Sequence, residues 1–446
     1  MSDRGLGYAR NGDVRLAYRV FGESGPTVVW APGWMIGNVD TMDHPDSPYA
    51  RLIELMSQIT QFVVWDRRGT GLSDPATHLL SLDERMDDLS AVLHAVGGDR
   101  PTLVGSGEGG AITLLFAATF PEGLRSLVLW GTAARYSQDL PDFPWGFTPA
   151  ELQAQLDDID NHWGEGALFE LFHGEASDVA GAREMFGKLQ RSTMSPAMAK
   201  LWWRALTEVD VRGVLRSVRT PTLVLARPGD RLVPAEAAAA LAADLPHAEF
   251  HSLPPGPHNG ADIIDELVSH TLNFVCDTPS APTQERVLKT VMFTDIVGST
   301  EKLSARGDAH WRHQLDNHDR VVDYLLSRYG GIRANHTGDG IFALFDAPTR
   351  AVRCALDLVP ALATRAIPIR VGVHTGECER RGPEWSGMAV HTGARIGALA
   401  GAGEVFASRT VRDLSVGSGL VFENLGPHRL KGLPEEIDVC RVTIGN

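Results

Sequence analysis

The chain has 446 residues, a length that predicts two or three domains rather than one core. Its apolar fraction of 43% and charged fraction of 22% are ordinary for globular proteins and argue against a mainly disordered chain. The net charge of −15 disfavours nucleic acid or an anionic membrane as the main partner. No stretch approaches the roughly 18 apolar residues that span a bilayer, and the N-terminus lacks the apolar run of a signal peptide. We therefore expect a cytoplasmic protein with no transmembrane segment.

Charge is unevenly distributed along the chain. Residues 1–284 carry a net charge of −16, whereas residues 285–446 carry +1. Near the change lies DTPSAPTQ, whose prolines and small polar residues are typical of a linker. The predicted organisation is a first domain, a linker and a second domain over 1–277, 278–286 and 287–446.

Short apolar runs alternate with helical stretches in the first domain, a pattern typical of a mostly parallel sheet with helices on both faces. Strands are predicted over Val14–Phe21, Thr27–Ala31, Phe62–Asp66, Thr102–Val104, Ser126–Trp130, Thr222–Ala226 and Glu249–Leu253. Helices are predicted over Ala50–Ile59, Asp83–Val96, Gly109–Thr119, Ala235–Ala243 and Asp262–Cys276. Residues 135–210 interrupt this rhythm with helical, tryptophan-containing sequence. They predict either a cap over the carboxyl edge of the sheet, where such folds bind ligands, or an insertion that packs on the core.

The second domain has a different order of elements. It is predicted to contain, in order, a strand over Leu288–Phe293, helices over Thr300–Arg306 and Ala309–Tyr329, a hairpin of Ile332–Asn335 and Ile341–Phe345, a helix over Thr349–Ala363 and a strand over Ile367–His374. This order is that of a β-α-β-β-α-β, ferredoxin-like α+β domain.

A glycine-rich turn in the first domain, PTLVGSGEGG, fits two motifs. Gly105, Gly107 and Gly110 match the dinucleotide fingerprint GxGxxG, but the next strand ends without the acidic residue that would bind the ribose. In the nucleophile elbow G-x-S-x-G, Gly105 and Gly109 are the small flanking residues and Gly107 stands where the serine belongs. Ser106 is out of this frame. Glycine adopts the positive φ of such a turn without strain, so the second motif predicts an elbow without its nucleophile.

Further motifs resemble the α/β-hydrolase superfamily across nearly all of 10–276. WAPGW resembles the oxyanion loop, and WDRRGTGLSDP resembles the D-x-R-G-x-G-x-S turn. ARPGDRLVP places Asp230 at the position of the triad acid, and PPGPHNG places His258 at that of the triad histidine. The resemblance implies a degenerate triad of Gly107, Asp230 and His258. Such a domain is expected to sense a small lipophilic ligand, to keep the pair for a structural role, or to activate water through His258.

Two motifs of the second domain each contribute an aspartate. KTVMFTDIVGST is an apolar strand that ends in Asp295, and NHTGDGIFALF is a tight turn in a hairpin that carries Asp339. Carboxylates presented from adjacent strand ends suit hard divalent cations, which take oxygen ligands. Two such cations activate a hydroxyl nucleophile and stabilise a leaving phosphate. The sequence therefore predicts that Asp295 and Asp339 bind metal.

These motifs, with GVHTGE, SGMAVHTGARIGALAGAGEVFAS and LGPHRLKGLPE after them, resemble the class III adenylyl/guanylyl cyclase catalytic domain over about 287–443. The fusion of the two domains resembles the mycobacterial lipase-like adenylyl cyclases. The resemblance implies ATP as substrate, a homodimer through the cyclase domains with sites at the interface, and two Mg²⁺ or Mn²⁺ ions per site.

The resemblance also assigns four further residues. Arg395 matches the arginine that stabilises charge on the phosphates. Asn335 stands where the family has its base-reading lysine, Glu384 where it has the base-reading aspartate, and His391 where it has the transition-state asparagine. Each replacement can still hydrogen-bond, so the predicted site accepts ATP with reduced selectivity against GTP.

We thus expect an adenylyl cyclase that converts ATP to 3′,5′-cyclic AMP and pyrophosphate, with a hydrolase-like domain as its sensor. The alternatives are an α/β-hydrolase acting on esters and a non-catalytic ligand-binding sensor.

Overall fold

The computed structural model describes residues 3–34, 37–45, 47–174, 181–277, 286–298, 308–337, 340–381, 384–433 and 435–445. Apart from residues 81–83, the chain forms one compact unit up to Thr283 and a second from Gln284 onwards. The linker predicted over 278–286 falls almost wholly outside the described residues, and the first strand of the second unit already begins at Arg286. Among the described helices, none combines the length and apolar character needed to cross a membrane.

The first unit is built on an eight-stranded sheet in the order β1-β2-β4-β3-β5-β6-β7-β8. Its strands are β1 (Asp3–Asn11), β2 (Val14–Phe21), β3 (Thr27–Ala31), β4 (Gln61–Trp65), β5 (Thr102–Ser106), β6 (Leu127–Trp130), β7 (Thr222–Ala226) and β8 (Ala248–Ser252). Its helices outside the cap are α1 (Ala50–Met56), α2 (Leu82–Val96), α3 (Gly109–Thr119), α8 (Ala235–Asp244) and α9 (Ile264–Asp277), with short 3₁₀ turns at Pro121–Gly123, Arg212–Ser217 and Ala261–Ile263.

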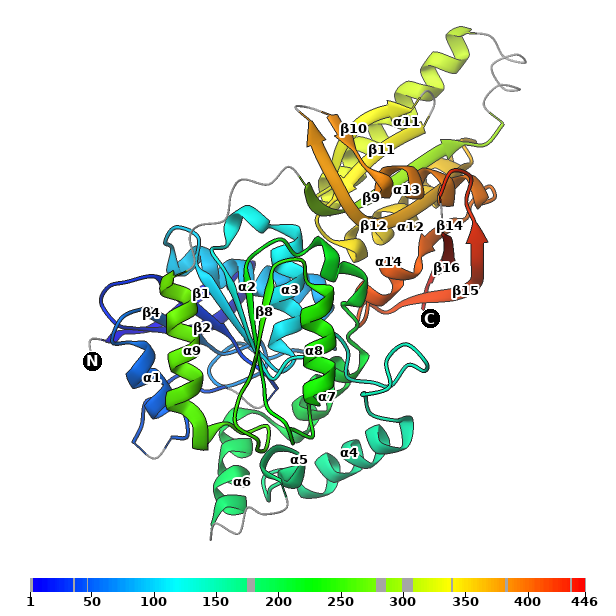
Figure 1. The fold of residues 1–446 in the computed structure, drawn as a ribbon. Coiled ribbons are helices and arrows are strands. Elements are labelled where there is room, and N and C mark those ends of the chain that lie inside the picture. The colour runs from blue at the N-terminus through cyan, green and yellow to red at the C-terminus, as the bar shows by residue number, and fades with distance from the viewer. Residues whose placement is uncertain are drawn as a thin grey trace. The chain divides into compact units, whose positions relative to one another are not determined.

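The predicted mostly parallel sheet with helices on both faces is confirmed. Strands β3 to β8 pair in parallel, while β1 and β2 are antiparallel at one edge. Helices α1 and α9 cover one face, and α2, α3 and α8 cover the other (Figure 1). The central strands are fully buried because both faces are covered, which is why they read as unbroken apolar runs.

The edge strand β1 was not predicted. Its sequence, DRGLGYARN, contains two glycines and four charged or amide side chains, which are poor strand formers. The strand forms because it pairs with β2 over most of its length, with an irregularity between Asp3 and Leu6. Only one face of this edge is buried: Ala9 is 1% exposed, whereas Leu6 and Tyr8 are 41% and 48% exposed.

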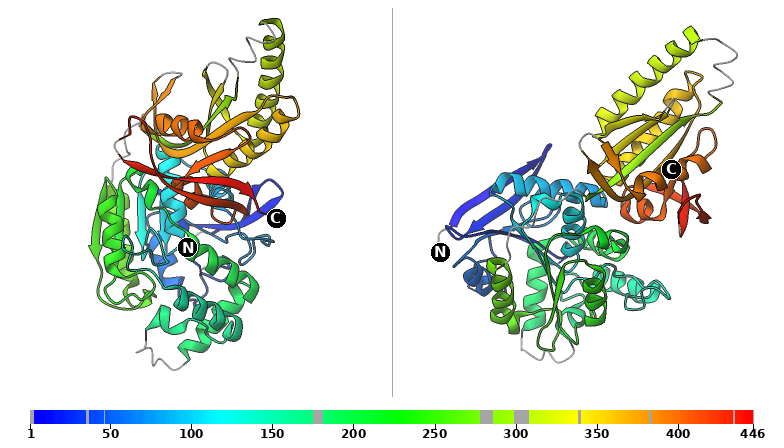
Figure 2. Two further views of the ribbon diagram at one scale, coloured as in Figure 1. Left: turned by 90° about the vertical axis from the view of Figure 1, so that its right-hand side faces the viewer. Right: turned by 45° about the horizontal axis from the view of Figure 1, so that its top comes forward.

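The helical cap predicted between β6 and β7 is confirmed. It comprises α4 (Pro149–His162), α5 (Phe169–His173), α6 (Ala182–Thr193) and α7 (Pro196–Glu208), which gather at one end of the unit (Figures 1 and 2). Helix α4 begins with a capping box in which Thr148 and Glu151 satisfy each other's backbone N–H groups. Helix α7 is capped by Ser195 alone, whose side chain accepts from the N–H of Met198.

The second unit is an α+β domain whose elements begin in the predicted β-α-β-β-α-β order. Its elements are β9 (Arg286–Ile296), α11 (Asp308–Tyr329), β10 (Ile332–Thr337), β11 (Gly340–Phe345), α12 (Pro348–Ala363), β12 (Ile369–Arg381), β13 (Glu384–Ser386), α13 (Met388–Leu399), β14 (Val405–Ser408), α14 (Arg409–Leu414), β15 (Leu420–Arg429) and β16 (Glu436–Ile444). Strand β12 extends seven residues beyond the predicted end at His374, because it pairs antiparallel with β9 up to Glu379 and with β13 from Glu379 to Arg381. The helix predicted over Thr300–Arg306 lies outside the described residues.

The sheet of this unit runs β10-β11-β9-β12-β14-β16-β15, with β13 paired to β12. Its first four strands have the antiparallel ferredoxin-like arrangement. Helices α11 and α12 pack together over one face around a core that includes Val322, Leu358 and Val371. Helix α13 packs against β9 and β12. Among the predicted site residues, Asp295 lies in β9, and His391 and Arg395 lie in α13.

Candidate functional site

The turn between β5 and α3 has the geometry of a nucleophile elbow. Gly107, directly after β5, has a φ of +50°. L-residues rarely adopt this conformation, whereas glycine adopts it freely. A Cβ at Gly105 would lie 2.6 Å from the Cα of Gly110, and one at Gly109 would collide with the carbonyl oxygen of Ala31. The two flanking glycines are thus required by close packing of strand, turn and helix, as the G-x-S-x-G frame demands.

The position of the missing nucleophile is open. A Cβ at Gly107 would meet only the Nε2 atom of His258, at 3.9 Å, and the Cα of Gly33, at 4.0 Å. Both are ordinary van der Waals distances. A side chain at position 107 would therefore point at His258 without displacing a neighbour.

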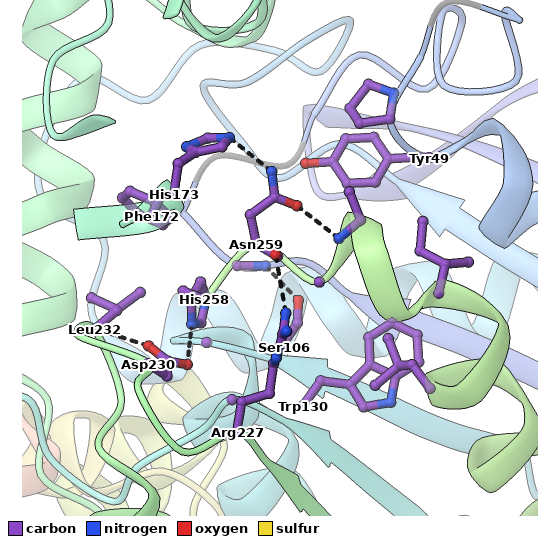
Figure 3. A pocket seen from close by; sticks show the side chains of 18 of the residues that line it. Tyr49, Ser106, Trp130, Phe172, His173, Arg227, Asp230, Leu232, His258 and Asn259 are labelled. Atoms are coloured by element: carbon purple, nitrogen blue, oxygen red, sulfur yellow. Dashed lines mark hydrogen bonds and ion pairs between the residues drawn. The ribbon is translucent and has the colours of Figure 1, made fainter. Parts of the chain in front are cut away.

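Asp230 and His258 form the pair that the sequence motifs assign to them. Asp230 follows β7 and His258 follows β8, and His258 Nδ1 lies 2.7 Å from Asp230 Oδ2 (Figure 3). The other carboxylate oxygen of Asp230 accepts from the backbone N–H groups of Leu232 and Val233 at 2.8 and 2.9 Å. Because Nδ1 of His258 donates its hydrogen bond to Asp230, the lone pair of Nε2 is directed towards the space beside Gly107.

Ser106 has a different role. Its Oγ accepts hydrogen bonds from Trp30 Nε1 at 2.9 Å and from the backbone N–H of Gly33 at 3.2 Å. These bonds tie the end of β5 to the WAPGW loop. Within the described part of the chain, no hydrogen bond joins Ser106 to His258, so Ser106 does not stand in for the absent serine.

A cavity of about 400 Å³ opens above the pair. Its wall combines residues from the strand ends, from the WAPGW loop and from the cap (Figure 3). Most of these residues are apolar or aromatic, among them Trp30, Trp34, Tyr49, Leu52, Trp130, Phe172, Phe186, Leu225, Leu253 and Leu267. Both its volume and its apolar lining are typical of small-molecule sites, which span roughly 300–1,000 Å³.

Sequence reasoning missed a buried ion network next to the elbow. Glu108, the residue after Gly107, is 1% exposed and accepts from Arg67 at 2.8 Å and from Arg85 at 2.6 Å. Burial lowers the pKa of both arginines, and Glu108 opposes that effect. Arg67 also donates to the carbonyl of Trp34 and stacks on Trp202 of α7. The network thus links the elbow, the WAPGW loop and the cap; only the fold brings its three charges together, so no sequence motif announces it.

In the second unit, Asp295 lies near the end of β9, beside the β10–β11 hairpin. Ile341 pairs with Thr294, the residue before Asp295, and Thr337 pairs with Gly340 to close the hairpin. Asp339 lies outside the described residues. The register therefore places the start of β11 beside the strand end that carries Asp295.

Asp295 is paired with an arginine. Arg370 stands directly opposite it on β12 and donates through Nε, at 2.8 Å, and through Nη2. Both donors contact Oδ2, and the carboxylate side chain is 43% exposed, so Oδ1 remains available to a cation. An oxygen ligand of this kind fits Mg²⁺ or Mn²⁺. Among the described residues, which exclude Asp339, no cluster of three or more acidic, histidine or cysteine side chains forms a metal site.

The remaining predicted residues are spread over three elements. His391 and Arg395 lie one turn apart on α13, and both are exposed. Asn335 pairs with Phe342 in the hairpin, and Glu384 of β13 pairs with Arg381, but the side chains of Asn335 and Glu384 lie outside what the structure describes. Within the described residues, no hydrogen bond or ion pair joins Asp295 to His391 or Arg395. As far as the described residues go, one copy of the chain thus does not bring Asp295 into contact with His391 or Arg395.

Comparisons with known proteins found both sequence relatives and structural neighbours. An uncharacterized protein of Mycobacterium tuberculosis is 33% identical over 121 residues, which are 26% of this chain and 42% of that protein. This chain thus spans less than half the length of that curated relative. An esterase from Exiguobacterium antarcticum matches with a TM-score of 0.54 at 20% identity, covering 60% of this chain and 99% of the esterase. An adenylyl cyclase from P. aeruginosa matches at 21% identity over 37% of this chain and 98% of its own, with a TM-score of only 0.34.

The family comparison is more extensive. The model of the alpha/beta hydrolase fold matches residues 37–262, about half of the chain. The matched range contains the elbow at Gly107, Asp230 and His258. The chain therefore belongs to the alpha/beta hydrolase fold family.

Proposed function

We propose that the chain is an adenylyl cyclase that converts ATP to 3′,5′-cyclic AMP and pyrophosphate at a homodimer interface. The observation that carries the proposal is the strand register, in which Ile341, near the start of β11, pairs with Thr294, the residue before Asp295. This arrangement supports a site in which Asp295 and Asp339 hold two Mg²⁺ or Mn²⁺ ions. When bound, the cations supply charge that stabilises the leaving phosphate and activates the attacking hydroxyl.

The chain's own residues have distinct tasks in this proposal. Asp295 offers Oδ1 to a cation while Arg370 holds its other oxygen, which fixes the carboxylate in one orientation. His391 and Arg395 project from the exposed face of α13. Because neither contacts Asp295 within one chain, they are available to a second copy, where Arg395 would stabilise phosphate charge and His391 would hydrogen-bond the ribose. Asn335 and Glu384 would read the base.

Product formation tests the proposal. The purified full chain is incubated with ATP, and separately with GTP, in Mn²⁺ and in Mg²⁺, and products are separated by chromatography. We expect cyclic AMP from the unchanged chain and none from Asp295→Ala. A folded, dimeric chain that yields no cyclic nucleotide in either metal would refute the proposal.

The hydrolase-like unit is proposed to bind a ligand that regulates the cyclase. The supporting observation is the combination of a cavity of about 400 Å³ with an elbow that has no nucleophile at Gly107. A site that keeps its pocket and lacks its attacking group is suited to binding rather than turnover. Removal of residues 1–280 is expected to change the rate of cyclic AMP formation, and an unchanged rate and ligand response would contradict regulation.

Ester hydrolysis is the second candidate, because the pair of His258 and Asp230 is intact. In this alternative His258 activates water directly as a general base. Hydrolysis of a chromogenic ester that disappears in His258→Ala would establish it.

A further inference from the structure

The chemistry of the ligand follows from the polar groups around the cavity. Several of them are already committed within the protein. Arg227 donates to both carboxylate oxygens of Asp262 at 2.9 and 2.8 Å and to neighbouring backbone carbonyls. Asn259 Nδ2 pairs with His173 Nε2 at 2.8 Å, and the amide oxygen of Asn259 accepts from the N–H of Ala261. The side chains of Arg227 and Asn259 are therefore occupied before a ligand enters.

His258 is different. In the part of the chain that the structure describes, its Nε2 atom makes no hydrogen bond, although the ring is held on two sides. Asp230 fixes Nδ1 at 2.7 Å, and the ring of Phe172 packs edge-on at 5.6 Å between centroids. A neutral imidazole whose Nδ1 proton points at a carboxylate is an acceptor at Nε2. Nε2 of His258 is therefore an oriented acceptor in the cavity that lacks a donor among the described residues.

The space in front of this acceptor is the place of the missing serine hydroxyl. A Cβ at Gly107 would already lie 3.9 Å from Nε2, and glycine leaves this volume to the cavity. A ligand hydroxyl fits there as the serine hydroxyl would in a complete elbow. The absence of the side chain thus creates a polar subsite at the base of an apolar pocket.

The charges around the cavity determine whether the polar group of the ligand is a hydroxyl or a carboxylate. Asp230 lies behind His258 and is 6% exposed, and Arg227, the lining residue able to offset a second anion, is held by Asp262. An anionic ligand would therefore add an uncompensated charge to an apolar cavity, which is strongly unfavourable. A neutral donor avoids this penalty.

We propose that the cavity binds an apolar, ring-containing molecule with one phenolic or enolic hydroxyl, which donates to His258 Nε2 in the space left by Gly107. Trp30, Trp130 and Phe172 supply the aromatic walls for its ring system. The inference rests on the proposed role of the hydrolase-like unit as a ligand-binding regulator, and it specifies what that unit recognises.

Two probes test the proposal, one with a free hydroxyl and one in which that hydroxyl is methylated. Isothermal titration calorimetry of the full chain compares 1-naphthol with 1-methoxynaphthalene, in the absence of nucleotide. One hydrogen bond to a preoriented neutral acceptor predicts that 1-naphthol binds about threefold to tenfold more tightly. Equal affinities, tighter binding of the ether, or no measurable binding of 1-naphthol would overturn the proposal.

Three variants locate the preference. His258→Phe retains a ring but removes the acceptor and is expected to abolish the preference for the hydroxyl. Gly107→Ala puts a carbon into the space that the ligand hydroxyl would occupy, and Gly107→Ser adds a competing hydroxyl to that carbon. We therefore expect both variants to lose most of the preference for the hydroxyl. The position-107 variants keep the test informative if His258→Phe does not fold, and a preference that persists unchanged in both would contradict the assignment of the subsite.

The ligand chemistry and the regulatory role are tested by separate measurements, so either can be refuted without the other. Cyclic AMP formation is measured separately, with and without saturating 1-naphthol. A hydroxyl preference without a change in rate would support the ligand chemistry and remove its regulatory consequence. A loss of the preference would overturn the ligand chemistry whatever the cyclase rate.

Discussion

Replacing Gly107 with serine tests whether Asp230 and His258 still have the geometry of a hydrolytic site. A Cβ at position 107 stands 3.9 Å from His258 Nε2, so a hydroxyl oxygen one bond further comes within the roughly 2.6–3.2 Å reach of a nucleophile–base hydrogen bond. The acid–base part of such a site typically contributes about 10²- to 10⁴-fold in rate. We expect Gly107→Ser to hydrolyse 4-nitrophenyl esters faster than the unchanged chain by a factor in this range.

The same substitution has a structural penalty that is independent of catalysis. The φ of +50° at Gly107 lies in the left-handed region, where a residue with a Cβ is about 1–2 kcal/mol less favourable. Gly107→Ala carries the same penalty without a hydroxyl and is the matched control. We expect both variants to lose similar stability in thermal unfolding, and only the serine variant to hydrolyse esters.

A covalent label provides a second readout. A fluorophosphonate reacts with a serine that is activated by its histidine, and the adduct is located by mass spectrometry. We expect labelling at position 107 in Gly107→Ser and its loss in the double variant that also carries His258→Ala. If Gly107→Ser folds but neither hydrolyses ester nor is labelled beyond Gly107→Ala, the assignment of the elbow frame is wrong.

Three further predictions concern charges. Glu108→Gln leaves Arg67 and Arg85 buried without their carboxylate, so we expect the free energy of unfolding by denaturant to fall by about 3–5 kcal/mol. A fall of less than about 1 kcal/mol would contradict a stabilising role of Glu108 in the ion network. Burial raises the pKa of Asp66 from 3.8 to about 6, so its proton binds more tightly in the folded state. Stability should therefore fall by up to about 3 kcal/mol as pH rises from about 4 to about 6, and Asp66→Asn should lack this component; parallel pH profiles would refute it. Asp295→Asn should bind Mn²⁺ more weakly in electron paramagnetic resonance titrations, and unchanged binding would exclude Asp295 as a ligand.

The sequence was most informative where the local pattern and the fold agree. The strands Val14–Phe21, Thr27–Ala31 and Thr222–Ala226 and the helix Gly109–Thr119 have the predicted bounds. Each is a mainly apolar segment with glycine, proline or polar residues within two positions of its ends, so propensity, pattern and burial indicate the same element. The sequence also indicated the turn after β5, because close contacts require glycine at its two flanking positions.

Features that depend on distant partners were not predictable. Strand β1 exists because β2 offers it a partner, and its own residues favour irregular structure. The extension of β12 to Arg381 likewise depends on pairing with β9 and β13. The contact of Arg370 with Asp295 across two strands, and the burial of Glu108 between two arginines, follow from register and packing, for which a single sequence carries no local signal.

Mixing two inactive variants tests the central claim that cyclic AMP is made at sites shared by two copies of the chain. Asp295→Asn removes a proposed metal ligand, and Arg395→Ala removes the proposed phosphate contact from the other side of the interface. A heterodimer of the two contains one site with both native residues, so an equimolar mixture should recover about a quarter of the unchanged activity while each variant alone shows none. Activity in either variant alone, or a mixture as inactive as its components despite proven subunit exchange, would contradict the account.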